Sequence, residues 1–200
     1  MSLKTFGAEV LADFQTTAAI APSSRYLIRA MLEPLPLDQA SIVVEFGAGT
    51  GVMTQALLDR LPQHATLLAF EINPRLFRYL KGNLPDPRLL LFNASAETLG
   101  QELRRRGCQR VDAAVSSLGL TLMSEQQRRD VLCELVPFLD QKSVFTQFQY
   151  IHGQLVYFRF KDGRAVRFSS GRLLRQYFAS VQRKIIWRNL PPAFVFTCYR

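Results

Sequence analysis

Apolar and polar positions alternate along the chain in a strand–helix rhythm. Short apolar runs predict strands at residues 42–46, 66–71, 88–92, 111–115 and 143–150. Between these runs, apolar residues recur at helical spacing, which predicts helices over residues 50–60, 74–82, 97–106 and 124–139. Strands that alternate with helices are typical of a parallel sheet with helices on both faces. The pattern therefore predicts an α/β domain.

The two ends of the chain follow a different pattern. A helical lead is predicted at residues 3–15 and 25–32, with a loop at 18–24 between them. After the fifth strand, Asp162-Gly163 predicts the turn of a hairpin formed by residues 155–160 and 165–168. A helix at 171–179 and strands at 181–187 and 193–199 follow, and the corner Arg188–Pro192 separates these strands. Because there is no repeat or linker, we expect one domain over residues 1–200, with a helical lead at 1–35 and a basic hairpin insertion at 151–170.

A glycine-rich loop follows the first strand. Gly47, Gly49 and Gly51 are spaced GxGxG, and Glu45 precedes them on the strand. Glycines permit tight turns and the close approach of a ligand. Glu71 ends the second strand, where an acidic side chain can accept hydrogen bonds from ribose hydroxyls. The spacing is not that of dinucleotide-binding or phosphate-binding loops, and Glu45 favours a ligand with an ammonium group. A strand–helix turn without a ligand is the alternative.

The stretches EFGAGTG and AFEINP together resemble the cofactor site of class I S-adenosylmethionine (SAM) methyltransferases. The resemblance implies a Rossmann-like fold, with a seven-stranded, mostly parallel sheet whose last strand is antiparallel. It also implies SAM as the cofactor. Ser95 stands where this family commonly has an aspartate that binds the adenine amino group, and Asn93 is an alternative partner. The implied cofactor-binding residues are Glu45, Gly47, Ala48, Gly49, Thr50, Gly51, Glu71, Ile72, Asn93, Ala94, Ser95 and Ser116.

Two groups within this family are candidates for the acceptor chemistry. The ribosomal RNA adenine dimethyltransferases carry an Asn-Leu-Pro-Tyr-like motif after the fourth strand, where this chain reads SSLGLTLM. The bacterial phospholipid N-methyltransferases resemble it over AIAPSSR at 19–25, the glycine loop, and WRNLPPAFVF at 187–196. That resemblance implies methylation of phosphatidylethanolamine. The family's glycine–proline pair is replaced at residues 117–120, so another aminolipid, a soluble amine or RNA stays open as the acceptor.

The same resemblance and the sheet topology suggest acceptor-side residues. The corner after the strand at 181–187 is expected at the carboxyl edge of the sheet, beside the site of methyl transfer. Arg25 and Arg188 are candidates for binding a lipid phosphate, because a planar guanidinium can bind phosphate bidentately. Tyr150 or His152 is expected to orient or deprotonate the amine. The remaining candidates are Ser116 and Ser117 for catalysis, and Ser23, Ser24, Tyr26 and Asn189 for the substrate.

The charge distribution and the remaining composition bear on partners and location. The formal charge is +9, and residues 151–200 hold ten basic residues and one acid, so the whole excess lies there. Such a surface is expected to attract an anionic membrane or RNA, or it is a solvated face. The apolar stripe at 3–15 either lies in a membrane interface or packs on the sheet. Three distant cysteines, no metal-ligand spacing and no membrane-spanning run predict a cytoplasmic protein without a metal, and peripheral attachment to the inner face of the cell membrane is the alternative location.

Overall fold

The computed structural model describes residues 24–151, 158–161 and 164–200. The predicted helix at residues 3–15, together with Ser23 and His152, lies outside the described residues. The helices are α2 (Arg25–Leu32), α3 (Val52–Leu58), α4 (Pro74–Asn83), α5 (Leu99–Arg105), α6 (Glu125–Leu135) and α8 (Ser170–Leu174). Short 3₁₀ turns are η1 (Leu37–Gln39), η2 (Ala96–Thr98) and η3 (Val136–Phe138). The strands are β1 (Ile42–Phe46), β2 (Thr66–Phe70), β3 (Leu89–Phe92), β4 (Ala113–Ser116), β5 (Val144–Tyr150), β6 (Phe158–Lys161), β7 (Arg164–Arg167), β8 (Ser180–Ile186) and β9 (Ala193–Tyr199).

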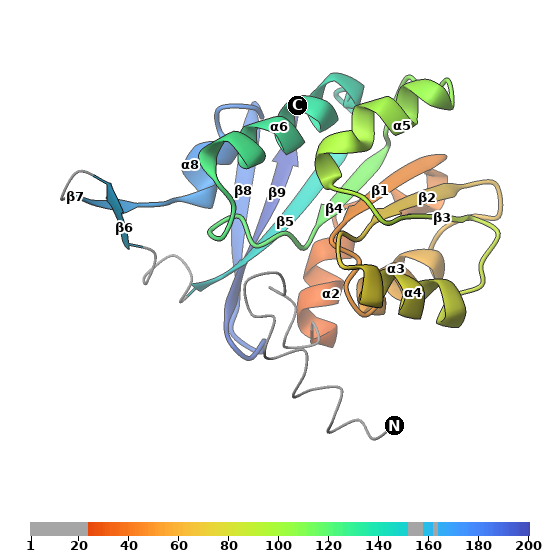
Figure 1. The fold of residues 1–200 in the computed structure, drawn as a ribbon, viewed down its shortest axis with the longest axis horizontal. Helices are drawn as coiled ribbons and strands as arrows, with labels where there is room; N and C mark the ends of the chain where they lie inside the picture. The colour runs from red at the N-terminus through yellow and green to blue at the C-terminus, as the bar shows by residue number, and fades with distance from the viewer. Residues whose placement is uncertain (1–23, 152–157, 162–163) are drawn as a thin grey trace.

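Seven of the strands form one sheet in the order β3-β2-β1-β4-β5-β9-β8 (Figure 1). Strands β1 to β5 pair in parallel, and β9 is antiparallel to both of its neighbours. This is the predicted Rossmann-like arrangement, including the antiparallel last strand. Because β8 runs in the same direction as β1 to β5, the turn after it lies at the carboxyl edge of the sheet, as predicted.

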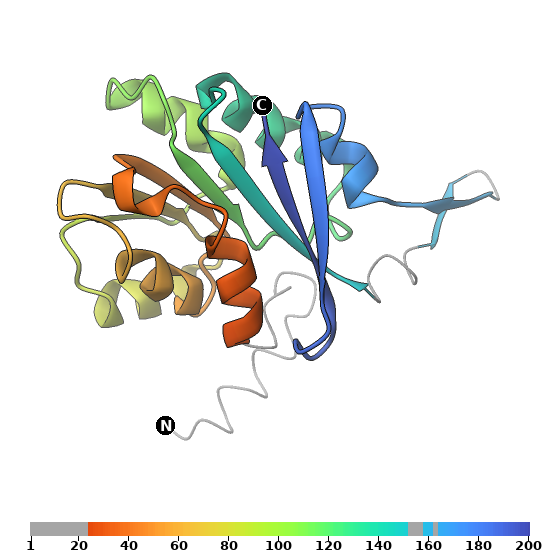
Figure 2. The same ribbon diagram turned by 180° about the vertical axis from the view of Figure 1, so that it is seen from behind.

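Helices cover both faces of this sheet (Figures 1 and 2). Alternate strand residues point to opposite faces, so Val43 and Leu67 pack with α2 and α3, whereas Val44 and Leu68 pack with α5 and α6. All four side chains are fully buried. The continuous apolar runs of these strands are therefore explained by a sheet that is buried on both sides.

The helix starts are encoded locally. Ser24 caps α2 by accepting a hydrogen bond from the Leu27 N–H, and Asn73 caps α4, whose first residue is a proline. The predicted capping serine of the helix at 124–139 forms a complete capping box, because Ser124 and Gln127 each accept from the other's backbone. Each of these caps gives a hydrogen-bond partner to an N–H group in the first turn of its helix.

The C-terminal quarter contains the predicted hairpin and one helix that is shorter than predicted. Strands β6 and β7 form a separate two-stranded sheet that extends away from the main body (Figure 1), as expected for an insertion outside the seven-stranded sheet. The helix expected at 171–179 is only Ser170–Leu174. After it, tighter hydrogen bonds turn the chain so that the ring of Phe178 stacks on Phe145 with centroids 5.4 Å apart. Burial of that ring thus ends the helix early.

The structure also bears on the cysteines and on membrane-spanning helices. Cys108, Cys133 and Cys198 are all free thiols, as their spacing predicted. Within the described ranges, no helix is both long enough and apolar enough to cross a membrane.

Candidate functional site

The glycine loop turns sharply between β1 and α3. Gly47, Gly49 and Gly51 have φ angles of 77°, 58° and 84°, a region that side-chain-bearing residues rarely adopt. At Gly51, an added Cβ would lie 2.5 Å from Leu80 and 2.7 Å from Leu84 of the neighbouring helix segment. At Gly47, it would lie 3.4 Å from Leu118 in the loop after β4. Backbone conformation therefore favours glycine at all three positions, and close packing adds to this at Gly51.

Four N–H groups of this loop donate hydrogen bonds within the protein. Gly47 and Ala48 both donate to the Phe70 carbonyl at 2.9 and 3.1 Å, and the Gly51 N–H donates to Ala48. The Gly49 N–H donates to the Glu71 carboxylate at 2.7 Å. Phosphate-binding loops instead direct such N–H groups at the ligand. These four N–H groups are therefore not directed at a ligand.

Glu71 joins the glycine loop to the turn after β2. One carboxylate oxygen accepts from Gly49, and the other accepts from the Asn73 N–H at 2.7 Å. The side chain is buried but still lines the pocket described below. Because each carboxylate oxygen has a second lone pair, Glu71 can also accept hydrogen bonds from a bound hydroxyl group.

Glu45 is a buried carboxyl group beneath this loop. It is 0% exposed, and its oxygens make no well-formed hydrogen bond among the described residues. Burial raises the pKa of Glu45 to about 7; the Thr54 hydroxyl acts against this rise, and the nearby Glu71 carboxylate adds to it. An unpaired buried carboxyl group is costly. A cationic ligand group close to this carboxyl would offset that cost, although Glu45 itself does not line the pocket described below.

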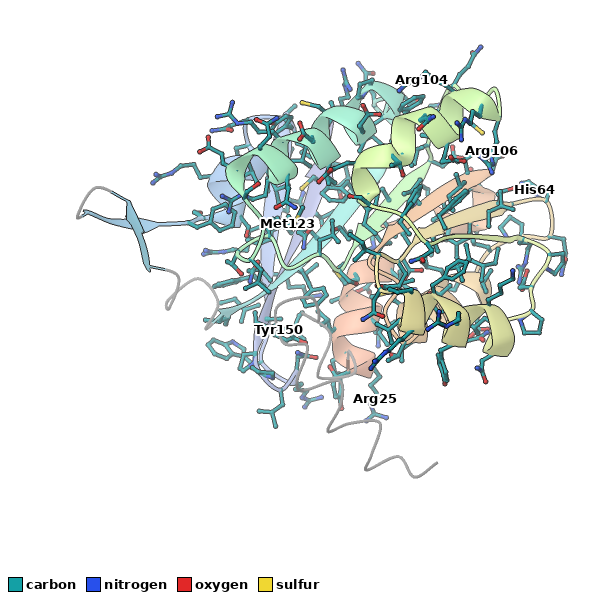
Figure 3. All side chains as sticks on the ribbon, viewed as in Figure 1. Arg25, His64, Arg104, Arg106, Met123 and Tyr150 are labelled. Atoms are coloured by element: carbon teal, nitrogen blue, oxygen red, sulfur yellow. The ribbon has the colours of Figure 1, made fainter. Side chains whose placement is uncertain are left out.

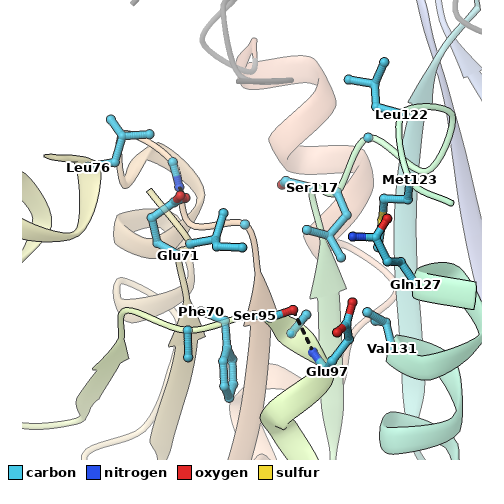
Figure 4. A pocket seen from close by; sticks show the side chains of 17 residues that line it. Phe70, Glu71, Leu76, Ser95, Glu97, Ser117, Leu122, Met123, Gln127 and Val131 are labelled. Atoms are coloured by element: carbon cyan, nitrogen blue, oxygen red, sulfur yellow. Dashed lines mark hydrogen bonds between the residues drawn. The ribbon is translucent and has the colours of Figure 1, made fainter. Parts of the chain in front are cut away.

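A pocket of about 260 Å³ opens at the carboxyl edge of the sheet (Figure 4). It lies between the ends of β1 to β4 and the start of α6. Its lining combines an apolar majority with a few polar side chains, as is usual for small-molecule sites. The lining residues are Gly47, Gly49, Phe70, Glu71, Ile72, Leu76, Ala94, Ser95, Ala96, Glu97, Ser117, Leu118, Gly119, Leu122, Met123, Gln127 and Val131.

The structure places several predicted cofactor residues in this pocket and others behind it. Ser95 lines the pocket and also caps η2 by accepting from the Glu97 N–H. Asn93 is not in the lining, because its amide group donates to the carbonyls of Glu71 and Ile72. Ser116 is fully buried and accepts from Leu118, whereas Ser117 reaches the pocket. Of the remaining predicted cofactor residues, Glu45, Ala48, Thr50 and Gly51 do not line the pocket.

Two polar lining residues were not found from the sequence. Glu97 lies beside Ser95, and the Gln127 side chain points into the pocket from α6 (Figure 4). The Gln127 side-chain oxygen is held by the capping box, so its amide N–H groups face the cavity. Glu97 is only two residues beyond Ser95, which was a usable signal. Gln127 enters the pocket only through the packing of α6, and no local sequence feature indicated it.

The β8–β9 corner contacts the start of α2. The Asn189 side chain is 2% exposed, accepts from the Ser24 N–H at 3.1 Å and donates to the Pro191 carbonyl at 2.7 Å. The Ile151 N–H donates to the Pro192 carbonyl at 3.0 Å. The corner thus ties together the N-terminal end of α2 and the end of β5, and the Asn189 amide is used for this connection.

Two arginines share one aromatic ring beside this connection. The guanidinium carbons of Arg25 and Arg188 lie 4.9 and 5.3 Å from the centre of the Tyr26 ring. Arg25 also donates to the Tyr26 hydroxyl at 2.9 Å. This hydrogen bond and the charges of both arginines lower the pKa of Tyr26. The structure thereby brings together three of the predicted substrate-binding residues from opposite ends of the chain.

Tyr150 lies at the same end of the molecule as Arg25 (Figure 3). Its ring contacts Phe148 edge to face, with centroids 5.3 Å apart. Burial raises the pKa of Tyr150 above its ordinary value. The phenol is therefore neutral at physiological pH and can orient a ligand by hydrogen bonding, but it does not supply a phenolate base.

In the part of the chain that the structure describes, no cluster of three or more His, Cys, Asp or Glu side chains could hold a metal.

Known proteins resemble this chain in sequence and in structure. The chain is 29% identical over 182 residues to the ornithine lipid N-methyltransferase of Singulisphaera acidiphila, a match that covers 90% of this chain and 87% of that protein. The precorrin-6y C5,15-methyltransferase of Geobacter metallireducens has a similar structure, with a TM-score of 0.65 at 13% identity, over 92% of this chain and 93% of the other. The chain is a SAM-dependent methyltransferase with the class I fold. No family model matches it.

A third match is shorter. The ribosomal RNA small subunit methyltransferase H of Aromatoleum aromaticum is 30% identical over 95 residues, which are 48% of this chain and 30% of that protein. It is consistent with the methyltransferase assignment, but it leaves most of that protein unmatched.

The site residues fit SAM as the cofactor of this methyltransferase. SAM carries a sulfonium and an ammonium group, and the buried carboxyl group of Glu45 lies behind the pocket lining, where its negative charge would favour a nearby cation. Glu71 has lone pairs available for ribose hydroxyls, and Ile72, which is 62% exposed at the pocket, would provide an apolar surface for the adenine ring. Ser95 and Glu97 offer acceptors for the adenine amino group.

Proposed function

We propose that this methyltransferase transfers methyl groups from SAM to the amine of an aminolipid headgroup at a membrane surface. Phosphatidylethanolamine, its partly methylated forms and ornithine lipid are the candidate acceptors. The observation that carries the proposal is the similarity to an ornithine lipid N-methyltransferase over nearly the full length of both chains. The acceptor side of the site supports the same class of substrate.

Such a headgroup combines a cationic amine with an anionic phosphate or carboxylate. The guanidinium groups of Arg25 and Arg188 flank Tyr26 at the carboxyl edge, and guanidinium groups bind either anion bidentately. Asn189 holds these two segments together through Ser24. We therefore assign Arg25 and Arg188 to the anion of the headgroup, and Asn189 and Ser24 to positioning them.

The reaction requires the amine nitrogen to face the methyl group in line with the departing sulfur. Bound SAM supplies an electrophilic methyl group on its sulfonium. The loop at residues 117–123 forms the pocket wall between the cofactor residues and β5, and Gln147 of β5 fixes this wall by donating to the Leu118 carbonyl at 3.0 Å. We propose that the Tyr150 hydroxyl accepts a hydrogen bond from the amine and directs its lone pair, while the apolar wall excludes water.

A second candidate function is methylation of RNA on the same scaffold. It is favoured by the partial similarity to ribosomal RNA methyltransferases and by the basic C-terminal quarter. It is less well supported, because those matches cover less than half of this chain. Methylation of a soluble amine would account neither for the similarity to ribosomal RNA methyltransferases nor for the basic C-terminal quarter.

Comparison of acceptors under identical conditions tests the proposal. The protein is incubated with methyl-labelled SAM and, separately, with vesicles that contain phosphatidylethanolamine, vesicles that contain ornithine lipid, ribosomal RNA and free ethanolamine. Vesicles of phosphatidylcholine, whose amine is already fully methylated, are the matched control. We expect label in an aminolipid and none in phosphatidylcholine. Label in RNA or free ethanolamine alone would overturn the proposal.

A further inference from the structure

The turn between β8 and β9 exposes large apolar side chains. Trp187 is 70% exposed and Leu190 is 86% exposed, and they lie on either side of Arg188 and Asn189. Together, residues 187–190 are called the tip. Single exposed apolar residues are common on protein surfaces, but two large ones so close together suggest a contact surface.

The exposed side chains of the tip are held outward by a well-connected turn. Asn189 points inward, and its amide is bonded to the backbones of Ser24 and Pro191. The Pro192 carbonyl accepts from the end of β5, and the Asn189 N–H donates to Ile186 at 3.3 Å. The tip therefore presents its apolar residues from a fixed frame, which lowers the entropy cost of docking.

The charges around the tip favour an anionic partner. Arg188 lies within it, and Arg25 lies beside it across the Tyr26 ring. The edge strand β8 adds the exposed Arg183 and Lys184. Residues 180–192 contain no acidic residue. On the adjacent α2, Glu33 is 3.9 Å from Lys184 and from Arg29, which leaves the net charge of this surface positive.

We propose that the tip docks the protein onto an anionic lipid bilayer, with Trp187 and Leu190 inserted at the boundary between headgroups and acyl chains. Tryptophan favours this depth of a bilayer, and nearby arginines pair with lipid phosphates. Arg188 and Arg25 then lie at the level of the headgroups. The inference rests on the proposed function and adds to it a location for membrane contact.

Docking at the tip also orients the active site. The tip, the start of α2 and the end of β5 all lie at the carboxyl edge, where the cofactor pocket opens. In Figure 3, Arg25 and Tyr150 lie at one end of the molecule and Arg104 lies toward the other. A bilayer against the tip therefore faces the edge at which an aminolipid headgroup would meet the cofactor.

The protein reports this contact with its own fluorescence, because Trp187 is its single tryptophan. The full chain is titrated with vesicles of phosphatidylglycerol and phosphatidylethanolamine, with excitation selective for tryptophan. We expect the emission to shift to the blue, and acyl chains that carry bromine to quench it. Binding to the vesicles by co-sedimentation with unchanged Trp187 emission would overturn the proposal, because another surface would then make the contact.

Two variants and a matched control test the residues of the tip. Leu190→Asp is expected to weaken vesicle binding by about tenfold or more, and Arg188→Ala by about fivefold. Arg104→Ala removes an exposed arginine at the opposite end and is expected to leave vesicle binding unchanged. SAM binding and thermal stability are measured in each variant to confirm folding. Equal vesicle affinity in all three variants would contradict the proposal.

Methyl transfer is measured in the same samples so that the two proposals can fail separately. Lipid methylation without a Trp187 response would remove docking by the tip and leave the proposed activity standing. A Trp187 response to vesicles without methylation of any aminolipid would support docking by the tip and overturn the proposed activity. A Trp187 response to RNA and none to vesicles would overturn docking on lipid and assign the tip to nucleic acid.

Discussion

Replacement of Glu45 by glutamine should affect stability and cofactor binding in opposite directions. Glu45 is fully buried and its oxygens make no well-formed hydrogen bond among the described residues. Glutamine has nearly the same shape but cannot ionise. The variant therefore removes the penalty of a buried negative charge, and it also removes the charge that we assign to the ammonium group of SAM.

The sign of the pH dependence follows from the raised pKa of Glu45. In the folded protein this pKa is about 7, compared with an ordinary value of 4.5. Between these two pH values, the folded state binds more protons than the unfolded state, so the free energy of unfolding falls as the pH rises. The loss is complete above pH 7 and amounts to about 3 kcal/mol at most. The glutamine variant does not undergo this loss.

Thermal unfolding without SAM at pH 5 and pH 8 measures this effect. We expect wild type and Glu45→Gln to be similar at pH 5, and the variant to melt roughly 5 to 10 °C higher at pH 8. SAM affinity at pH 8 should be lower in the variant by about tenfold or more. Glu33→Gln, at an exposed position, is the control and should show neither effect. A stability difference between wild type and Glu45→Gln that is the same at both pH values would refute the reasoning.

Three further substitutions test other parts of the site. Glu71→Gln should weaken SAM binding by about 1.5 to 3 kcal/mol in calorimetry, because a charged acceptor for Gly49 and for a ribose hydroxyl is lost; unchanged affinity would contradict the cofactor placement. Gly51→Ala should lower the free energy of unfolding by about 1 to 3 kcal/mol, since its Cβ would lie 2.5 Å from a leucine of α4 at a φ of 84°; a neutral result in chemical denaturation would show that the loop can relax. Asn189→Ala should cost about 1 to 3 kcal/mol of stability by freeing the Ser24 N–H, and should raise the KM for lipid without changing SAM affinity; a change in SAM affinity alone would argue against its positioning role.

Much of the fold could be predicted from the sequence because its signals are local. The boundaries of β1, α2 and β9 agree with the predicted ranges to the residue. The parallel pairing of strands β1 to β5 followed from the alternation of strands and helices. The hairpin β6–β7 was predicted from its turn, and its place outside the main sheet followed from the resemblance to a seven-stranded fold, because turn chemistry alone does not determine which sheet a hairpin joins.

The site could be predicted only where a motif describes it. The glycine loop and Glu71 were identified by spacing, and the structure brings them together through the Gly49–Glu71 hydrogen bond. Gln127 was missed because it reaches the pocket only through the packing of a helix. The corner at Arg188–Pro192 was recognised as unusual, but the inward direction of Asn189 depends on a contact with Ser24, 165 positions away in the chain. Contacts of that range leave no pattern in a single sequence.

The central claim is that the amine of an aminolipid receives the methyl group of SAM. Mass spectrometry of lipids recovered from vesicles, after incubation with SAM that carries a trideuterated methyl group, tests it most directly. The account predicts that headgroup fragments of phosphatidylethanolamine or ornithine lipid gain the mass of one or more trideuterated methyl groups, while the acyl chains gain none. Unlabelled lipid headgroups, together with the deuterated methyl group on RNA or on a soluble amine, would contradict it.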